Sequence, residues 1–174
     1  MSNNLYSKDL VSVDDISLQD LNLIFAKTKE MNKLVKVKGG DNRLKGKILA
    51  SLFFEPSTRT FSSFLTAMQR LGGGVIPLQG MSNTSIAKGE TLEDTVRVFS
   101  NYADVLVIRH PEPGAISSLA GSSFKPIINA GDGINEHPTQ ALIDMVTIMG
   151  NTSLKSVYSL KCNFLFLRYL RMLS

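Results

Sequence analysis

The first candidates for chemistry are four polar side chains in the stretch FFEPSTRT: Ser57, Thr58, Arg59 and Thr60. They directly precede apolar residues of helical period, so they belong to the start of a helix. A helix N-terminus presents unpaired backbone N–H groups and about half a positive charge, which attract phosphate. Hydroxyls and a guanidinium in that first turn would complete a phosphate site. The alternative is that Ser57 or Thr58 only caps the helix and Arg59 is a solvated charge.

Three further groups of polar side chains follow apolar runs in the same way. They are Ser82, Thr84, Ser85 and Lys88; then Arg109 and His110; then Asn135, His137 and Gln140. Cations, hydroxyls and an amide with few carboxylates suit an anionic ligand that has an oxygen to be polarised. The set does not resemble the paired carboxylates of glycoside hydrolysis. We interpret His110 as a structural or surface residue.

Simpler interpretations of these residues stay open at this point. His137 precedes Pro138 and could only cap a helix, and Arg109 could be an edge charge that pairs with Glu112. The connection that carries Ser85 and Lys88 could be a solvated loop, although structureless connections of about a dozen residues are often functional.

Composition narrows the class of protein. The chain has 174 residues, of which 43% are hydrophobic and 20% charged, as in ordinary soluble domains. A formal charge of +4 without a basic run favours a small anion over nucleic acid. One cysteine and two histidines predict neither a disulfide within the chain nor a metal site. No signal peptide or membrane-spanning stretch is evident, so we expect a cytoplasmic protein that does not bind a membrane.

The elements that must position these side chains alternate along the chain. Strands are predicted at 47–54, 74–78, 104–108 and 125–129, and helices at 17–35, 57–71, 92–102 and 138–149, the last of which Gly150 would end. This alternation predicts an α/β fold, a parallel sheet with helices on both faces in three layers. In such a sheet the loops after the strands lie along one edge, where ligands bind. All four polar groups are on these loops.

Four ordered motifs resemble the aspartate and ornithine carbamoyltransferase family: S-T-R-T at 57–60, N-T-S-x-x-K-G-E-T at 83–91, R-H-P at 109–111 and H-P-T-Q at 137–140. The stretches N-T-S-I-A-K-G-E-T, R-H-P-E-P-G and N-A-G-D-G-I-N-E-H-P-T-Q are more similar to the aspartate branch, which serves pyrimidine synthesis. The resemblance covers residues 1–150 and implies the first, carbamoyl-phosphate-binding domain of a carbamoyltransferase.

The resemblance also implies roles for the candidate residues. Ser57, Thr58, Arg59 and Thr60 would hold the phosphate, and Arg59 would stabilise charge on the departing phosphate. Thr60, Arg109 and His137 would donate to the carbamoyl oxygen. Gln140 would orient the carbamoyl nitrogen. The reaction would need no metal or organic cofactor.

Partners follow from the same resemblance. Ser85 and Lys88 would reach the site of a neighbouring subunit, which implies a homotrimer with shared active sites, and regulatory chains are compatible with it. L-Aspartate would bind through a second domain. Residues 151–174 do not resemble the start of that domain, so we interpret them as a divergent or truncated tail. We expect the chain to bind carbamoyl phosphate without turnover. The alternatives are ornithine carbamoyltransferase and a noncatalytic anion-binding or assembly module.

Overall fold

The computed structural model describes residues 5, 8–80, 89–119 and 121–151. The chain divides into two compact units, residues 1–139 and 140–174. The first unit contains α1 (Leu18–Lys38), β1 (Ile48–Phe53), α2 (Thr58–Arg70), β2 (Gly74–Gln79), α3 (Leu92–Tyr102), β3 (Val105–His110), the short 3-10 helix η2 (Ser117–Leu119) and β4 (Ile127–Asp132). Helix α4 (Pro138–Asn151) begins with the last two residues of the first unit and continues into the second unit.

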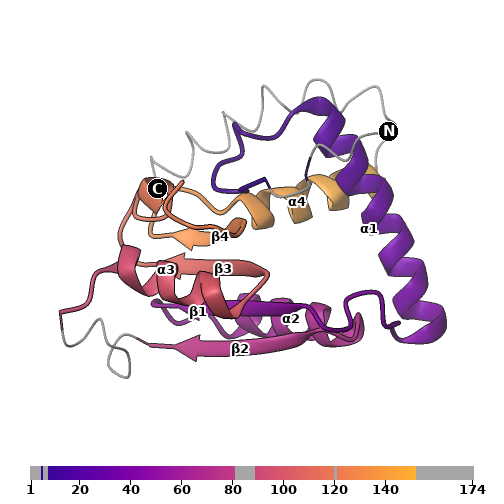
Figure 1. Ribbon diagram of the computed structural model, residues 1–174. Helices are drawn as coiled ribbons and strands as arrows, with labels where there is room; N and C mark the ends of the chain where they lie inside the picture. Colours follow the sequence, from indigo (N-terminus) through magenta and orange to yellow (C-terminus); the bar gives the residue numbers. More distant parts are fainter. Residues whose placement is uncertain (1–4, 6–7, 81–88, 120, 152–174) are drawn as a thin grey trace. The chain divides into compact units, whose positions relative to one another are not determined.

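Four parallel strands form the sheet of the first unit, in the order β2-β1-β3-β4 (Figure 1). Because the strands are parallel, their carboxyl ends share one edge of the sheet. The register pairs Phe53 at the end of β1 with Arg109 of β3, and His110 with Asp132 of β4. The predicted α/β fold with a parallel sheet is confirmed.

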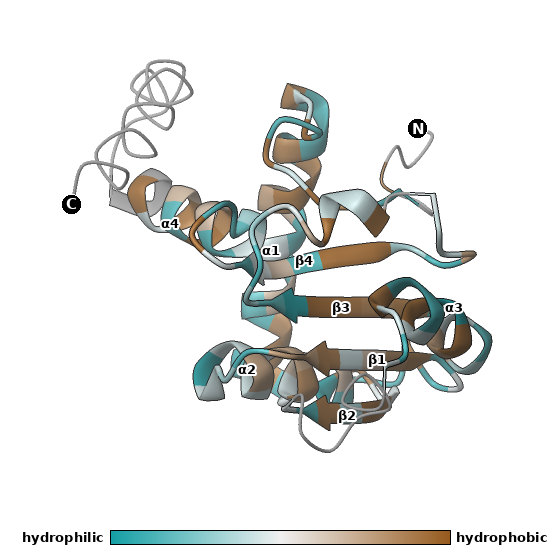
Figure 2. Cartoon of the chain, turned by 90° about the vertical axis from the view of Figure 1, so that its left-hand side faces the viewer, coloured by the Kyte–Doolittle hydropathy of each residue, from teal (hydrophilic) through white to brown (hydrophobic). Residues whose placement is uncertain are grey.

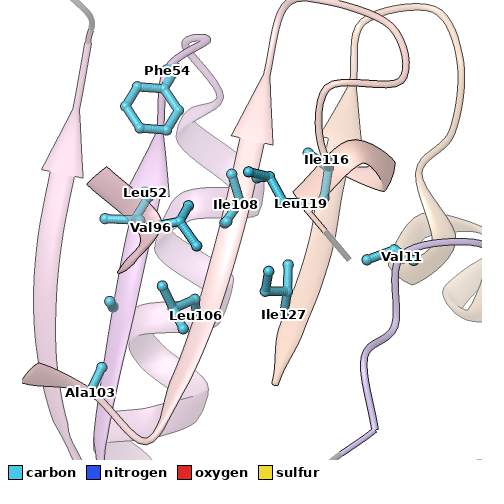
Figure 3. Packing of buried hydrophobic residues seen from close by; sticks show 11 residues of the cluster. Val11, Leu52, Phe54, Val96, Ala103, Leu106, Ile108, Ile116, Leu119 and Ile127 are labelled. Carbon is cyan, nitrogen blue, oxygen red and sulfur yellow. The ribbon is translucent and has the colours of Figure 1, made fainter. Parts of the chain in front are cut away.

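One face of the sheet is covered by α3 and η2. Ala50, Leu52 and Phe54 alternate onto this face, where Leu52 and Ile108 join Val96 of α3 in a buried cluster (Figure 3). Ile116 and Leu119 extend this cluster beside β4, and Val11 of the N-terminal segment also belongs to it (Figure 3). Burial of such apolar side chains is the main force that holds the helix against the sheet.

The opposite face is covered by α2. Leu49 and Phe53 alternate onto it and pack with Met68, and the ring of Phe61 meets Phe53 edge to face at 5.2 Å between centroids. The strands that separate these two layers carry apolar colour along much of their length, and β3 turns hydrophilic at its carboxyl end (Figure 2). Helices therefore lie on both faces, and the predicted three-layer arrangement is confirmed.

The N-terminal segment runs beside β4, which the sequence analysis did not predict. The Leu10 N–H donates to the Ile127 carbonyl at 2.8 Å, and the Asn129 N–H donates to the Leu10 carbonyl at 2.9 Å. The buried Asn129 side chain extends this pairing, because its Nδ2 donates to the Val11 carbonyl at 2.9 Å. The segment thus covers the edge of β4 that the sheet would otherwise leave unpaired.

Some element boundaries differ from the predicted ones. Strand β3 continues through Arg109 and His110, which were expected in the following loop, and β4 continues to Asp132. Pairing with the neighbouring strands extends both, an effect that local sequence does not reveal. Helix α4 passes through Gly150 and ends at Asn151. In the described ranges no helix is long and apolar enough to cross a membrane. Of the predicted tail at 151–174, residues 152–174 lie outside the described residues.

Candidate functional site at the carboxyl edge of the sheet

Helix α2 begins as the sequence predicts, with Ser57 at its N-cap position. Ser57 has φ −158° and ψ 88°, and its side chain forms no cap hydrogen bond. Ser57 therefore occupies the N-cap position without the side-chain hydrogen bond that the simpler interpretation required, and Thr58 is the first helical residue. Thr58 and Arg59 are exposed, and Ser57 and Thr60 are half-buried. The first turn contains no acidic residue, so its N–H groups and positive end remain available to an anion.

Arg109 occupies the neighbouring strand and pairs with a carboxylate that the sequence analysis did not consider. Its Nη2 lies 2.9 Å from Glu55 Oε2, and the side chains are 17% and 33% exposed, respectively. Nη1 donates to the Ala130 carbonyl at 3.1 Å. The alternative in which Arg109 pairs with Glu112 is wrong, because register places Arg109 beside Phe53 and hence near the residues that follow β1. The buried Arg109 Nε has no hydrogen-bond partner in the described structure.

Gly131 brings Arg109 and His137 together. A Cβ atom built on Gly131 would lie 2.5 Å from Arg109 Nη1 and 3.2 Å from His137 Cδ2. Both side chains therefore border the same small space, which any residue other than glycine would fill. Gly131 also has φ 117°, a conformation that other residues rarely adopt. Its N–H donates to Asn129 Oδ1 at 2.8 Å, which fixes the glycine against the buried end of β4.

His137 closes the loop between β4 and α4. Its ring is half-buried, and Nδ1 lies 3.2 Å from Thr139 Oγ1. The buried Pro138 that follows is the first residue of α4, a position proline favours because the first-turn N–H groups have no helical partner. His137 is thus presented at the start of a helix whose beginning is set by its own sequence.

The other predicted site residues lie in the second unit, outside the described residues, or in the loop before His137. Gln140 belongs to the second unit, where its Nε2 donates to Asp144 Oδ1 at 2.9 Å. Ser85 and Lys88, with Ser82 and Thr84, lie outside the described residues. Asn135 is half-buried in the loop that precedes His137, and its Nδ2 donates to Asp132 Oδ2 at 3.1 Å.

His110 has a structural environment, as expected. It is buried, its Nδ1 accepts the Glu112 N–H at 3.1 Å, and its ring packs edge-on against Phe54. Burial lowers the pKa of the imidazole, and the nearby carboxylate of Glu112 partly opposes this shift. His110 therefore favours the neutral form and supports the loop after β3 from inside.

Three residues of the site were missed from sequence: Glu55, Gly131 and Asp132. Glu55 immediately precedes Pro56 at the end of an apolar strand, and the Gly131-Asp-Gly133 run follows another strand. Glycine beside an acid at a strand end signals a tight turn and a close backbone approach. The glycines therefore indicated a close approach at this turn, but they do not identify which side chains lie against Gly131.

The arrangement suits binding of an anion and polarisation of an oxygen. The uncapped N-terminus of α2 follows β1, and Arg109 with His137 lies at the ends of β3 and β4, so all are on the carboxyl edge. A separate groove of about 710 Å³ is lined by Leu5 and by α1 residues such as Ile24 and Met31. It contains none of the candidate residues, so we do not assign it to the site.

Residues 8–150 match the family model described as aspartate/ornithine carbamoyltransferase, carbamoyl-P binding domain. The catalytic subunit of aspartate carbamoyltransferase from Methanopyrus kandleri is 51% identical over 143 residues, which are 82% of this chain and 46% of that protein. The multifunctional protein pyr1-3 of Dictyostelium discoideum is 49% identical over 146 residues, 84% of this chain and 6% of that protein.

Solved structures show the same correspondence. Aspartate transcarbamoylase from Trypanosoma cruzi, in complex with carbamoyl phosphate and aspartate, aligns with a TM-score of 0.77 and 44% identity, covering 83% of this chain and 47% of that one. The catalytic subunit of the Methanocaldococcus jannaschii enzyme gives a TM-score of 0.77 and 50% identity, with 83% and 47% covered. The chain spans about half the length of the archaeal catalytic subunits that it matches.

Proposed function

Because the chain belongs to the aspartate/ornithine carbamoyltransferase family, we propose that it supplies the carbamoyl-phosphate-binding half of an aspartate carbamoyltransferase. The observation that carries this proposal is the convergence of Arg109 and His137 at Gly131, on the sheet edge where α2 begins without a cap. An uncapped helix start suits a phosphate, and two neighbouring donors suit the carbonyl oxygen attached to it. Carbamoyl phosphate contains both groups in one molecule.

The phosphate would bind at the first turn of α2. Backbone N–H groups and the hydroxyls of Ser57, Thr58 and Thr60 would donate to its oxygens. Arg59 is exposed at this turn, and its planar guanidinium can contact two phosphate oxygens at once. As the phosphate departs, the same guanidinium would stabilise the charge that it gains.

The carbamoyl oxygen would lie toward Arg109, His137 and Thr60. When the amine of L-aspartate attacks the carbamoyl carbon, a C–N bond forms and this oxygen takes up the electron pair of the C=O bond. Donors placed beforehand stabilise that oxyanion without reorganisation. The intermediate then collapses, the bond from carbon to the phosphate oxygen breaks, and the amine loses a proton. No covalent intermediate with the protein is needed.

Other parts of the proposal rest on the family resemblance. Gln140 would orient the carbamoyl nitrogen, and Ser85 and Lys88 would act in the site of a neighbouring subunit in a homotrimer. The amino-acid substrate would be bound by a second domain, which corresponds to the half of the catalytic subunits that this chain does not match. We place the protein in the cytoplasm. Light scattering over a concentration series tests the assembly, and a monomer at all concentrations would contradict the trimer.

Turnover by these 174 residues alone is not expected. Placing an amine against the carbamoyl carbon can supply about 7–11 kcal/mol of the barrier in the best intramolecular cases, and random collision supplies none of it. We therefore expect no carbamoyl-aspartate above the uncatalysed rate from the pure chain. Product formation that saturates with aspartate and disappears in His137→Ala would show an amino-acid site within this chain.

Calorimetric titration with carbamoyl phosphate tests the binding function directly. Wild type should bind, and Arg59→Ala should bind at least tenfold more weakly, because a charge-assisted hydrogen bond contributes about 1.5–3 kcal/mol. Arg97→Ala is the matched control, since Arg97 is an exposed arginine of α3 whose Nη2 contacts only Glu93 at 3.0 Å among the described ion pairs. Equal affinity in wild type and Arg59→Ala would remove Arg59 from the phosphate site.

A further inference from the structure

Asp132 is a fully buried carboxylate at the end of β4 that none of the proposed catalytic steps uses. It lies opposite His110 of β3 in the sheet register. It is also the residue directly after Gly131, at which Arg109 and His137 converge. Burial of a carboxylate costs free energy unless its oxygens accept hydrogen bonds, so a fully buried aspartate at this position requires a reason.

Three donors surround the Asp132 carboxylate. Oδ2 accepts the Gly114 N–H at 2.9 Å and the Asn135 Nδ2 at 3.1 Å, and Oδ1 accepts the Glu136 N–H at 2.8 Å. Each partner donates, which matches an ionised carboxylate that can only accept. Within the described part of the chain, no lysine or arginine forms an ion pair with it. The carboxylate is therefore held by neutral donors from two different loops.

Those two loops are in close contact beside Asp132. The Gly133 N–H donates to the His110 carbonyl at 2.9 Å. A Cβ on Gly133 would approach the Pro111 carbonyl oxygen to 2.4 Å, so only glycine permits this approach. Gly114 belongs to the loop after β3, whereas Asn135 and Glu136 belong to the loop after β4. Asp132 thus ties the loop that follows Arg109 to the loop that leads into His137.

This connection restrains the backbone that leads into His137. Residues 133–136 separate Asp132 from His137, and the Glu136 backbone is bound to Asp132 twice: the Glu136 N–H donates to Oδ1, and the Asp132 N–H donates to the Glu136 carbonyl at 3.1 Å. Arg109 is fixed by its strand, while His137 depends on the course of this short loop. The Asp132 carboxylate therefore restrains the backbone that leads into His137, while the Ser12 hydroxyl and the Val13 N–H hold the Glu136 side chain at 3.0 Å each.

We infer that Asp132 is a positioning residue for the reaction: its carboxylate holds the loop at 133–136 so that His137 stays beside Arg109 at Gly131, where both can donate to one carbonyl oxygen. This inference rests on the proposed function for the identity of that oxygen. The geometric part, the control of His137 by Asp132, stands on the hydrogen bonds alone. Asp132 itself would touch neither substrate nor reacting atoms.

Asp132→Asn in the full 174-residue chain tests the inference. The carboxamide has nearly the same shape, but its NH2 group would face a backbone N–H where the carboxylate accepted one, so the loop must move. The chain has two histidines, so the ring signals of His137 in an NMR spectrum can be identified with a His110→Asn variant. We expect these signals to shift or broaden. Carbamoyl phosphate should bind on the order of tenfold more weakly, the effect of about 1.4 kcal/mol. Inorganic phosphate, which lacks the carbonyl oxygen, should be affected less.

Asp104→Asn is the matched control. Asp104 is also a carboxylate that accepts a backbone N–H, from Ile48 at 2.9 Å, but it immediately precedes β3 at the opposite end of the strand from His110. We expect it to lower stability without changing the His137 signals or ligand binding. Asn135→Ala removes one donor and leaves the buried charge in place, so it provides a test if Asp132→Asn does not fold.

The outcomes separate the two proposals. If wild type binds no carbamoyl phosphate, the proposed function fails, while the His137 signals still test the positioning. Unchanged His137 signals in folded Asp132→Asn would overturn the inference. If that variant does not fold, unchanged signals in Asn135→Ala would overturn it. Equal shifts in Asp104→Asn and Asp132→Asn would also overturn it, because the effect would then be a general loss of stability.

Discussion

Arg109 Nη1 and His137 Cδ2 both face the position where Gly131 has no side chain, at 2.5 and 3.2 Å from a Cβ built there. The two groups come from the ends of different structural elements, β3 and the loop before α4. A side chain at residue 131 would fill the space between Arg109 and His137, where an oxygen atom bound by both groups would lie. The absence of a side chain is therefore part of the site.

Gly131→Ala should weaken carbamoyl phosphate binding by at least tenfold, because the new methyl group must displace the Arg109 guanidinium, and a displacement of about 1 Å can cost a hundredfold in function. Because alanine is strained at a φ of 117°, the variant should also lose about 1–3 kcal/mol of the free energy of unfolding. Calorimetry and urea denaturation measure the two effects.

Gly46→Ala separates them. Gly46 has φ 81°, and a Cβ there meets nothing within 4 Å. This variant should lose stability yet bind carbamoyl phosphate as wild type does. Wild-type affinity in Gly131→Ala would mean that the ligand does not use the space at Gly131.

Glu55→Gln should strengthen binding of phosphate and carbamoyl phosphate by a factor on the order of three to ten. The carboxylate is 2.9 Å from Arg109 and repels an anion that approaches the same guanidinium. Removal of one such charge is worth about 1 kcal/mol near water. Calorimetry at low and high salt measures it, and the gain should be smaller at high salt.

Glu112→Gln is the control for this prediction. Glu112 is exposed in the loop after β3 and was the alternative partner that the sequence offered for Arg109. Its loss should change anion affinity less than the loss of Glu55. The reverse order would contradict the ion pair between Arg109 and Glu55.

His110→Asn should flatten part of the dependence of stability on pH. Burial lowers the pKa of His110 from its ordinary 6.5, so below that pH the unfolded chain binds more protons than the folded chain. The contribution of neutral His110 is complete above pH 6.5 and is lost as pH falls toward the folded pKa. Asn Oδ1 can replace Nδ1 as acceptor for the Glu112 N–H but does not titrate.

Urea denaturation of both proteins at a series of pH values measures this difference. The two proteins should respond alike above pH 6.5, and the wild type should lose more stability than His110→Asn as pH falls below 6.5. Carboxylates titrate in both proteins, so only the difference between them reports on His110. A constant difference across the range would show that the His110 pKa is the same in the folded and unfolded chain.

Ser17→Ala should lower the free energy of unfolding by about 1 kcal/mol, the usual effect of losing an N-cap. Ser17 Oγ accepts the Asp20 N–H at 3.1 Å, and the Asp20 side chain accepts the Ser17 N–H at 3.0 Å, which completes a capping box. The hydrogen bond from the Ser17 side chain is the main cause of the lowered pKa of Asp20.

Ser62→Ala provides the comparison, because Ser62 is an exposed residue inside α2 and caps nothing. Its replacement should leave stability unchanged or raise it slightly, since alanine favours helix. Similar losses in the two variants would indicate that the capping box at Ser17 contributes nothing specific.

The sequence by itself determined where several elements begin and which class of fold they build. The apolar run that becomes β1, the start of α2 at Ser57 and the start of α4 at Pro138 were all predicted, because periodicity, proline and helix-start chemistry act over a few neighbouring residues. Parallel strands with polar residues after them also predicted that the site lies along one edge. Local patterns suffice for these features because local forces produce them.

Only the tertiary structure decided which of these residues meet. The strand order β2-β1-β3-β4 and the register Phe53 with Arg109 bring Glu55 to Arg109, although Glu112 is much closer in sequence. The approach of Arg109 and His137 at Gly131 likewise depends on β3 and β4 being neighbours. Strand order results from burial of the two sheet faces by the whole chain, so spacing along the sequence does not contain these distances.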